Sequence, residues 1–334
     1  MKTVVSLQDL VDAEIRPQNL LAEYYVRLER DVRAFWARAQ LHDVTCPGCS
    51  RAETAVAFER FGATYRQCAT CGSVFVSPRP DEEALVSFYR TSPAARYWRD
   101  QVWPSTEATR REKLARPRAE WVIEGLAEYA PTAVAGLDLS PYGGPVIEEL
   151  SAEGKRMTAG GWLADIEMGS SSSKIDVRPL RTSSIGVVSP VDFVTAFDMV
   201  DRAADAPALF RAVAGVLPPG GLMFLTASNA DGFDLQVLWE QAPTFSPPDK
   251  LNVLSIDGML SLFGGPAWEV LECSTPGLFD VEQVRRAVAA DPTANWPGMV
   301  RRLLARGPSA AEDFQEFLQR HRLASFARLV VRRC

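Results

Sequence analysis

The stretch DFVTAFDMVDRAADAPALFRAVAGVLPPGGLMFLTAS, residues 192–228, decides the fold. Its two ends, DFVTAFDMV (192–200) and GLMFLTAS (221–228), are short apolar runs of the kind that form buried strands. The segment APALFRAVAGVL (206–217) between them indicates a helix. A strand, a helix and a second strand in this order predict a βαβ unit with parallel strands.

The same alternation begins upstream, near residue 118. Helices are indicated by WVIEGLAEYA (121–130) and PVIEELSAEG (145–154), and strands by AVAGLDL (133–139) and KRMTAG (155–160). This order predicts an α/β domain with a mostly parallel sheet and helices on both faces.

The last third of the chain is expected to close this sheet. WEVLECS (268–274) and FARLVV (326–331) predict two further strands. Ser309 and Glu312 between them have the spacing of a capping box, which predicts the start of a helix. A final hairpin of this kind would make the last strand antiparallel.

Four cysteines form two C-x2-C pairs near the N-terminus, Cys46 with Cys49 and Cys68 with Cys71. The 18 residues between the pairs are long enough for a β-hairpin that brings the four thiols together. Such a set suits one tetrahedral Zn²⁺ and predicts a zinc ribbon. Four thiolates leave no open position on the ion, so we expect its role to be structural.

Two disulfides are the alternative for these cysteines. Nothing else in the sequence indicates an oxidising compartment, because Asp12 and Glu14 interrupt the region where a signal peptide needs an apolar core. Cys273 and Cys334 stand alone and are expected to be ordinary thiols.

The ribbon could instead bind nucleic acid, as many zinc modules do. Its basic residues Arg51, Arg60 and Arg66 are nearly matched by Glu53 and Glu59. The whole chain carries a formal charge of −6, whereas phosphate binding relies on a concentrated basic face. A nucleic-acid partner is therefore not expected.

Length and composition predict a globular protein with a large and a small domain. The chain has 334 residues, of which 47 % are hydrophobic. No apolar run approaches the roughly 20 residues of a membrane-spanning helix. We expect a cytoplasmic protein without a membrane partner.

The chain is predicted to divide into four sections. They are an N-terminal helical segment (1–42), the zinc ribbon (43–80), a helical connector (81–125) and a Rossmann-like domain (126–334). Within the first section, apolar residues at helical spacing predict a helix over 19–38.

The sequence resembles bacterial class I S-adenosylmethionine (SAM)-dependent methyltransferases that carry an N-terminal zinc ribbon. The likeness rests on the cysteine pairs, on VFVSPRPDEEALVSFYR (74–90), on residues 192–226, and on ASNADGFDLQVLW (227–239). It extends from about residue 43 to the end. The resemblance implies a Rossmann-like methyltransferase fold with an antiparallel last strand, and a small-molecule acceptor such as a sugar or natural-product intermediate.

The resemblance also implies where SAM and the acceptor bind. Ligands of open α/β sheets lie beyond the carboxyl ends of the strands, which here is GLDLSPYGGP (136–145). The implied cofactor residues are Asp138, Ser140, Tyr142, Gly143, Gly144, Asp198 and Met199. Asn229 and Asp231 are the implied catalytic residues, and Tyr97, Asp234 and Trp239 border the implied acceptor.

The sequence departs from the family pattern in three places. Ser140 and Tyr142 stand where glycines are expected to pass under the cofactor, and Gly160 and Gly161 stand where a carboxylate is expected for the ribose. The histidines of the family's catalytic cleft are absent too: the only two in the chain, His42 and His321, lie outside it.

These departures leave two functional interpretations. Either the chain transfers a methyl group, with a carboxylate such as Asp231 orienting a hydroxyl. Or it keeps the fold without binding SAM, as a pseudoenzyme or a repurposed enzyme that acts through a protein partner or another ligand.

Overall fold

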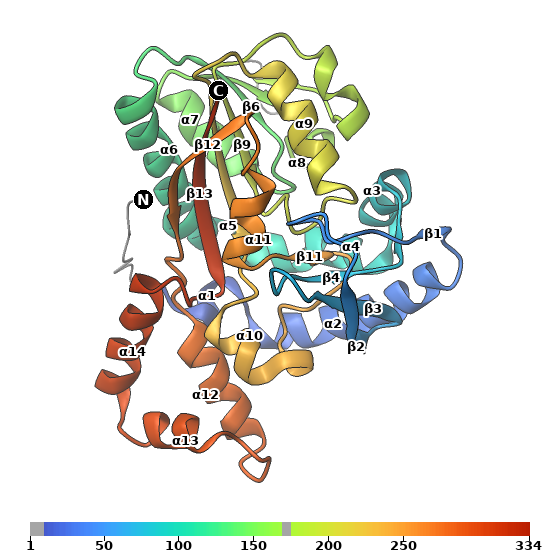
Figure 1. Cartoon of the computed structure of the whole chain (residues 1–334), viewed down its shortest axis with the longest axis vertical. Helices are drawn as coiled ribbons and strands as arrows, with labels where there is room; N and C mark the ends of the chain where they lie inside the picture. Colours follow the sequence, from blue (N-terminus) through green and yellow to red (C-terminus); the bar gives the residue numbers. More distant parts are fainter. Residues whose placement is uncertain (1–9, 169–174) are drawn as a thin grey trace.

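The computed structural model describes residues 10–168 and 175–334. A large mixed sheet with helices on both faces forms the upper part of the molecule as drawn, and the ribbon and three C-terminal helices lie below it (Figure 1). Within these described residues, no helix combines the length and the apolar character that crossing a bilayer requires.

The central sheet has seven strands in the order β12-β13-β10-β9-β6-β7-β8. Their bounds are β6 Ala135–Asp138, β7 Arg156–Ala159, β8 Asp176–Val177, β9 Phe193–Phe197, β10 Leu222–Ser228, β12 Trp268–Ser274 and β13 Phe326–Arg333. All neighbouring pairs are parallel except those of β13, which is antiparallel to both β10 and β12. The predicted βαβ units and the reversed last strand are therefore confirmed.

Helices cover both faces of this sheet (Figure 1). On one face, α6 (Arg116–Tyr129) and α7 (Gly144–Ala152) share a buried cluster with Phe193 and Phe224. On the other, α9 (Ala206–Val216) packs against Met223 and Leu225. Because side chains alternate between the faces of a strand, the apolar run of β10 supplies both cores.

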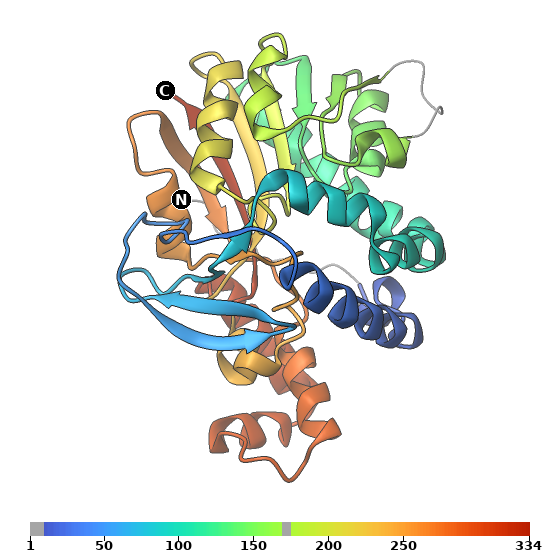
Figure 2. The ribbon, with the colours of Figure 1, turned by 90° about the vertical axis from the view of Figure 1, so that its right-hand side faces the viewer.

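The fourth strand of the ribbon sheet, β11, comes from a part of the chain that is distant in sequence. Its order is β11-β4-β3-β2, with β2 Thr54–Arg60, β3 Ala63–Cys68, β4 Val74–Val76 and β11 Asn252–Val253. The short strands β1 (Leu41–His42) and β5 (Arg79–Pro80) form a separate pair. Figure 2 shows the hairpin of β2 and β3 below the carboxyl edge of the central sheet.

The predicted N-terminal and connector helices are present. They are α1 Asp12–Ile15, α2 Gln18–Trp36, α3 Glu82–Thr91, α4 Pro93–Tyr97 and α5 Trp103–Arg110. Two π-helical turns, η1 Trp98–Val102 and η2 Arg111–Ala115, join α4, α5 and α6 into a nearly continuous helix. The helix expected over 19–38 ends two residues early, at Trp36.

The remaining helices all come after β7 in the chain. They are α8 Ala164–Met168, η3 Thr182–Val187, α10 Phe233–Leu238, η4 Trp239–Gln241, α11 Ile256–Leu262, α12 Asp280–Ala290, α13 Gly298–Leu304 and α14 Pro308–Arg320. The last three form an insertion between β12 and β13 that projects from the body (Figures 1 and 2).

The predicted capping box at Ser309 is wrong. Helix α14 begins at Pro308, its N-cap is Gly307, and no side chain caps it. Gly307 has φ +90°, which a residue with a Cβ rarely adopts, and Pro308 is already set for the first helical position. The glycine and proline therefore start the helix ahead of the serine.

Candidate functional site

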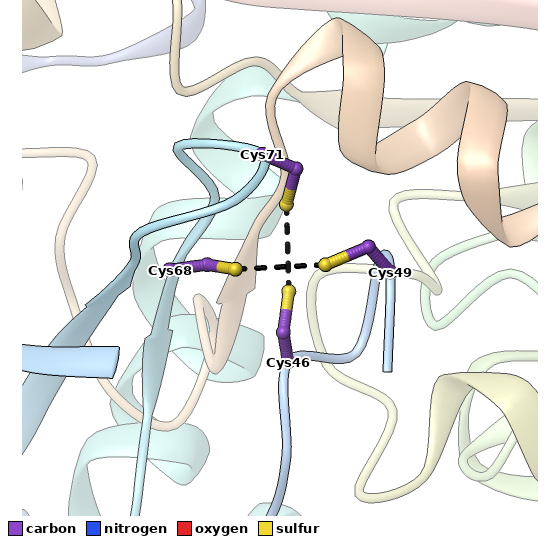
Figure 3. A group of neighbouring side chains, drawn as sticks. All are labelled: Cys46, Cys49, Cys68 and Cys71. Carbon is purple, nitrogen blue, oxygen red and sulfur yellow. Dashed lines mark hydrogen bonds between the residues drawn. The ribbon is translucent and has the colours of Figure 1, made fainter. Parts of the chain in front are cut away.

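Four cysteine side chains converge at one point of the ribbon (Figure 3). Their sulfur atoms all lie within 4.8 Å of one another. The Sγ atoms of Cys46 and Cys71 are 3.5 Å apart, as are those of Cys49 and Cys68. A disulfide needs about 2.05 Å, so the alternative of two cystines is not formed. Four converging thiols are the donor set of a closed tetrahedral metal site.

The end of the ribbon that carries the four cysteines packs against the start of α11. A Cβ on Gly48 would lie 2.8 Å from the Cα of Gly258, so the two backbones touch. Ser255 caps α11 by accepting from the amide of Gly258, and its own amide donates to the Oγ of Ser73 over 3.0 Å. Its hydroxyl donates to the carbonyl oxygen of Cys71. The cysteine knuckle and the N-terminus of α11 are therefore one hydrogen-bonded unit.

Arg79 joins the ribbon to two loops at the carboxyl edge of the sheet. Its buried side chain donates to the carbonyl oxygens of Leu251 and Ala203, and to Oδ1 of Asn252 over 2.7 Å. Asn252 in turn donates to the carbonyl oxygens of Val200 and Ala203. Burial lowers the pKa of Arg79 to about 10, so the guanidinium remains charged at neutral pH.

These two loops face each other through a crossed ion-pair ladder, Asp201 with Lys250 and Arg202 with Asp249. The side chain of Asp201 is fully buried, and it also accepts from the amide of Ser228 over 3.0 Å. Burial raises the pKa of Asp201, and the Lys250 ammonium only partly offsets this. The ladder thus holds a desolvated carboxylate in place.

The second rung of the ladder is slightly more open to solvent. Nε of Arg202 lies 3.1 Å from Oδ1 of Asp249, whose side chain is 18 % exposed. The hydroxyl of Tyr24 donates to the other oxygen of Asp249 over 3.1 Å. Burial alone would lower the pKa of Arg202, but Asp249, Tyr89, Tyr142 and Asp198 together outweigh it and raise this pKa above its ordinary value. This hydrogen bond from Tyr24 connects helix α2 to the ion-pair ladder.

Asp138 ends β6, and groups of the chain itself satisfy its carboxylate. Oδ1 accepts from the hydroxyls of Thr195 (2.6 Å) and Ser140 (2.7 Å), and Oδ2 accepts from the Ser140 amide (3.1 Å). A Cβ on Gly143 would lie 2.0 Å from Oδ2, so only glycine lets the loop fold over the carboxylate. Burial raises the pKa of Asp138 to about 6, although these hydrogen bonds oppose the shift. Three predicted cofactor residues, Asp138, Ser140 and Gly143, thus lie together, and the Asp138 oxygens bond to Ser140 and Thr195.

Tyr142, in the same loop, packs between aromatic and cationic side chains. Its ring stacks on Trp103 at 5.6 Å between centroids and lies 6.3 Å from the ring of Trp98. The guanidinium of Arg202 lies 5.8 Å from its centroid. The next predicted cofactor residue, Gly144, begins α7.

A small cavity lies beyond the carboxyl ends of β6 and β7. Its volume is about 10 Å³, and Leu139, Gly160, Trp162 and Met199 are among the residues that line it. Glu82 of α3 closes it by accepting from Nε1 of Trp162 and from the amide and hydroxyl of Thr182. Such a cavity holds about one water molecule.

Asp198 and Met199 follow β9, as predicted. Asp198 adopts φ +57°, and its carboxylate accepts from Thr226 (3.0 Å) and pairs with Arg118 (3.3 Å). Burial alone would raise the pKa of Asp198, but Arg118, Lys250 and Arg202 outweigh it and lower this pKa to about 2. The Asp198 side chain is 29 % exposed, so it is an ionised group within reach of solvent.

The two predicted catalytic residues hold neighbouring backbone. Asn229 is fully buried, and its side chain donates to the carbonyl oxygen of Ala324 over 3.0 Å. Asp231 accepts from the amide of Ile256 over 2.8 Å, at the start of α11. Both therefore connect the end of β10 to other segments in this conformation.

The three predicted acceptor residues lie in different surroundings. Asp234 is buried against a second carboxylate, Asp280. Tyr97 packs under Arg27 of α2, with 4.6 Å from the guanidinium to the ring centroid. Trp239 packs against Phe58 of the ribbon at 5.7 Å between centroids. The described contacts do not bring these three together.

Sequence reasoning missed four residues of the candidate site: Tyr24, Glu82, Arg118 and Asp249. A usable signal existed only for Asp249, because Asp-Lys at 249–250 and Asp-Arg at 201–202 are matching acid–base dipeptides. The others reach the site from helices that are distant in sequence, which one sequence does not reveal.

The model of a methyltransferase domain family matches residues 107–272, from α5 to β12. The match supports a class I methyltransferase domain. This domain contains the strand ends that carry Asp138 and Asp198. No curated protein matches the chain.

Solved structures that resemble the chain include a putative sarcosine dimethylglycine methyltransferase from Galdieria sulphuraria, with 16 % identity, a TM-score of 0.43, and coverage of 66 % of this chain and 87 % of that one. Another is magnesium protoporphyrin IX methyltransferase from Synechocystis PCC 6803, with 11 % identity, a TM-score of 0.47, and coverage of 76 % and 100 %. A SAM-dependent methyltransferase from Clostridium acetobutylicum ATCC 824 has 11 % identity, a TM-score of 0.45, and coverage of 69 % and 98 %. At these values the likenesses carry no functional argument.

Proposed function

We propose that the chain transfers a methyl group from SAM to a small-molecule acceptor, such as a sugar or natural-product intermediate. The observation that carries this proposal is the methyltransferase match over 107–272, laid on a sheet whose order reverses between β6 and β9. Open α/β sheets bind their ligands at such a switch point. Asp138 and Asp198 stand at the ends of these two strands.

The residues at this point do not fit SAM in the conformation described. The cavity of about 10 Å³ is far too small for an adenosine, and the Asp138 oxygens are taken by Ser140 and Thr195. Binding would require the loop at 139–144, or Trp162 with Glu82, to move.

A second candidate function is favoured by the packing of Ser140 and Tyr142 in the predicted cofactor loop. Here the methyltransferase fold persists without binding SAM, and the protein acts through a partner or a different ligand. The support is specific: Ser140 supplies hydrogen bonds that lock Asp138, and Tyr142 packs where a glycine would leave space.

Titration calorimetry of metal-loaded protein with SAM and with S-adenosylhomocysteine distinguishes the two. Methyl transfer predicts micromolar binding that Asp138→Ala abolishes. The second function predicts no binding by the wild type. In that case the variant Ser140→Gly/Tyr142→Gly, which removes both blocking side chains, should gain binding. A folded double variant that also fails to bind would exclude SAM as a ligand of this site.

The acceptor side requires a group that orients or deprotonates a hydroxyl. Asp231 and Asn229 are the predicted candidates, but both bond to backbone in this conformation. Asp249 and Asp198 are ionisable alternatives with partly exposed side chains, and we propose that the acceptor binds next to them.

We propose that the four cysteines bind Zn²⁺ and that the ion is structural. Four sulfur ligands complete a tetrahedral shell and leave no position for water. A reducing compartment such as the cytoplasm keeps such thiols free to bind metal. Through Ser255 and Arg79, the loaded ribbon would hold the ion-pair ladder in position and so form one wall of the acceptor cleft.

A further inference from the structure

A half-buried guanidinium of the connector lies beside the loop that follows β6. Arg110 ends α5, and its guanidinium lies 5.6 Å from the ring centroid of Trp98 and 5.7 Å from that of Trp103. Trp103 in turn stacks on Tyr142, which belongs to this loop. Arg110 is therefore held next to the switch point at which open α/β sheets bind their ligands.

The described contacts give Arg110 no carboxylate partner. Its Nε donates to the hydroxyl of Thr106 over 2.9 Å, and a terminal nitrogen donates to the carbonyl oxygen of Ile15 in α1. Asp198 is near enough to act on Arg110, but this carboxylate is already paired with Arg118. A desolvated cation is normally paired with an anion, so an unmatched one at a ligand-binding edge indicates a ligand of negative charge.

Two neighbouring arginines add positive charge at this place. Burial, Arg16 and Arg118 lower the pKa of Arg110 to about 10, so the guanidinium remains charged at neutral pH. Arg16 pairs with Asp12 and Arg118 with Asp198, whereas Arg110 lacks such a partner among the described residues. The chain as a whole has a formal charge of −6, so this excess of positive charge is local and favours an anion.

We infer that Arg110 binds an anionic group, a carboxylate or a phosphate, of a ligand that lies against the loop after β6. The two indole rings hold the guanidinium in place, so little conformational freedom is lost when the anion binds. The anion replaces the carbonyl oxygen of Ile15 as the acceptor, and Arg118 adds to the attraction. A planar guanidinium forms two parallel hydrogen bonds with either kind of anion.

Two ligands carry such a group. SAM has a carboxylate, and an acidic acceptor has a carboxylate or a phosphate. The assignment to either of them rests on the proposed methyl transfer, whereas binding of an anion by Arg110 does not.

Three proteins test the site: the wild type, Arg110→Met and Arg99→Met. Arg99 is the matched control because it lies in the same run of helices and donates to the carbonyl oxygens of Tyr89 and Arg90. Its loss removes comparable hydrogen bonds and leaves the arginines around Tyr142 intact. Circular dichroism and the melting temperature without added anion verify that the variants fold.

Inorganic phosphate is the first probe, with sodium chloride used to keep the ionic strength constant. We expect phosphate to raise the melting temperature of the wild type and of Arg99→Met. Arg110→Met should need at least about tenfold more phosphate for the same rise, because a charged hydrogen-bonded contact is lost. An Arg110→Met protein that responds to phosphate as the wild type does would overturn the inference.

Calorimetry with S-adenosylhomocysteine and with methylthioadenosine, which lacks the carboxylate, identifies the source of the anion. If SAM supplies it, Arg110→Met should bind S-adenosylhomocysteine at least about tenfold more weakly than the wild type does, and methylthioadenosine equally well. If the acceptor supplies it, all three proteins should bind S-adenosylhomocysteine alike, and phosphate should not weaken this binding.

The two measurements separate this inference from the proposed methyl transfer. A protein that responds to phosphate through Arg110 but does not bind S-adenosylhomocysteine keeps the anion site and loses the methyl-transfer proposal. A wild type that does not respond to phosphate overturns the inference when S-adenosylhomocysteine binds equally to the wild type and Arg110→Met, or to neither.

Discussion

Replacing Lys250 with methionine should destabilise the protein through the carboxylate that it leaves behind. Asp201 is fully buried, and Lys250 is the cation that pairs with it. Removing one partner of a buried pair typically costs about 3–5 kcal/mol. Asp201 keeps its hydrogen bonds from Ser228, and the Lys250 side chain is 20 % exposed. We therefore expect a loss near the lower end, about 3 kcal/mol in the free energy of unfolding.

The pH dependence separates charge from packing. Burial already raises the pKa of Asp201, and removal of the ammonium raises it further. A raised pKa means that the folded state takes up a proton at a higher pH than the unfolded chain does. The penalty of Lys250→Met should therefore be larger at pH 8 than at pH 5, because Asp201 takes up a proton as the pH falls.

Urea unfolding at both pH values measures this penalty. The matched control is Lys113→Met, whose partner Glu14 is 39 % exposed and so stays hydrated; it should cost much less than Lys250→Met. The double variant Asp201→Asn/Lys250→Met should recover most of the loss, since no buried charge remains. An equal loss at pH 5 and pH 8 would refute the reasoning and assign the effect to lost packing.

Three further outcomes are expected. Chelation of the proposed metal, or the variant Cys68→Ser, should unfold the ribbon. Because β11 pairs with β4 of the ribbon, amide hydrogen exchange in β11 should become faster, while β7 stays protected. Unchanged exchange in β11 would contradict this coupling. Asp234→Asn should stabilise the fold by roughly 1–3 kcal/mol at pH 8 but not at pH 5. The reason is that burial and Asp280 raise the pKa of Asp234 well above its ordinary value, so the stability from its protonated form is lost as pH rises; urea unfolding that shows no gain at pH 8 would contradict this. Gly258→Ala should lower the free energy of unfolding by about 1–3 kcal/mol, because its Cβ would lie 2.2 Å from the Oγ of Ser73. The control is Gly265→Ala, whose Cβ meets open space. Equal shifts of the melting temperature for both variants would argue against a tight contact at Gly258.

The sequence allowed the central sheet and the cysteine cluster to be predicted because both depend on local patterns. Period and composition identify strands such as DFVTAF, and the spacing of the two C-x2-C pairs identifies four thiols that converge in space.

The contacts of the candidate site could not be predicted in the same way, because they join residues that are distant in the sequence. Asp249 meets Arg202 across 47 residues and Tyr24 across 225. Glu82 reaches Thr182 across 100. Nothing local marks such partners, so residues chosen from short motifs, such as Asp234, were placed next to an acceptor although a second carboxylate lies beside them.

The pairing of β11 with β4 limits where the chain can be cut into separate fragments. A fragment that ends at residue 80 would lack β11. The edge of β4 would then have no partner strand, and an unpaired strand edge promotes aggregation. The complementary fragment would keep Asn252 without Arg79. Chimaeras that exchange the ribbon should therefore carry residues 249–258 along with the cysteines, because this segment bonds to Arg79 and to Cys71.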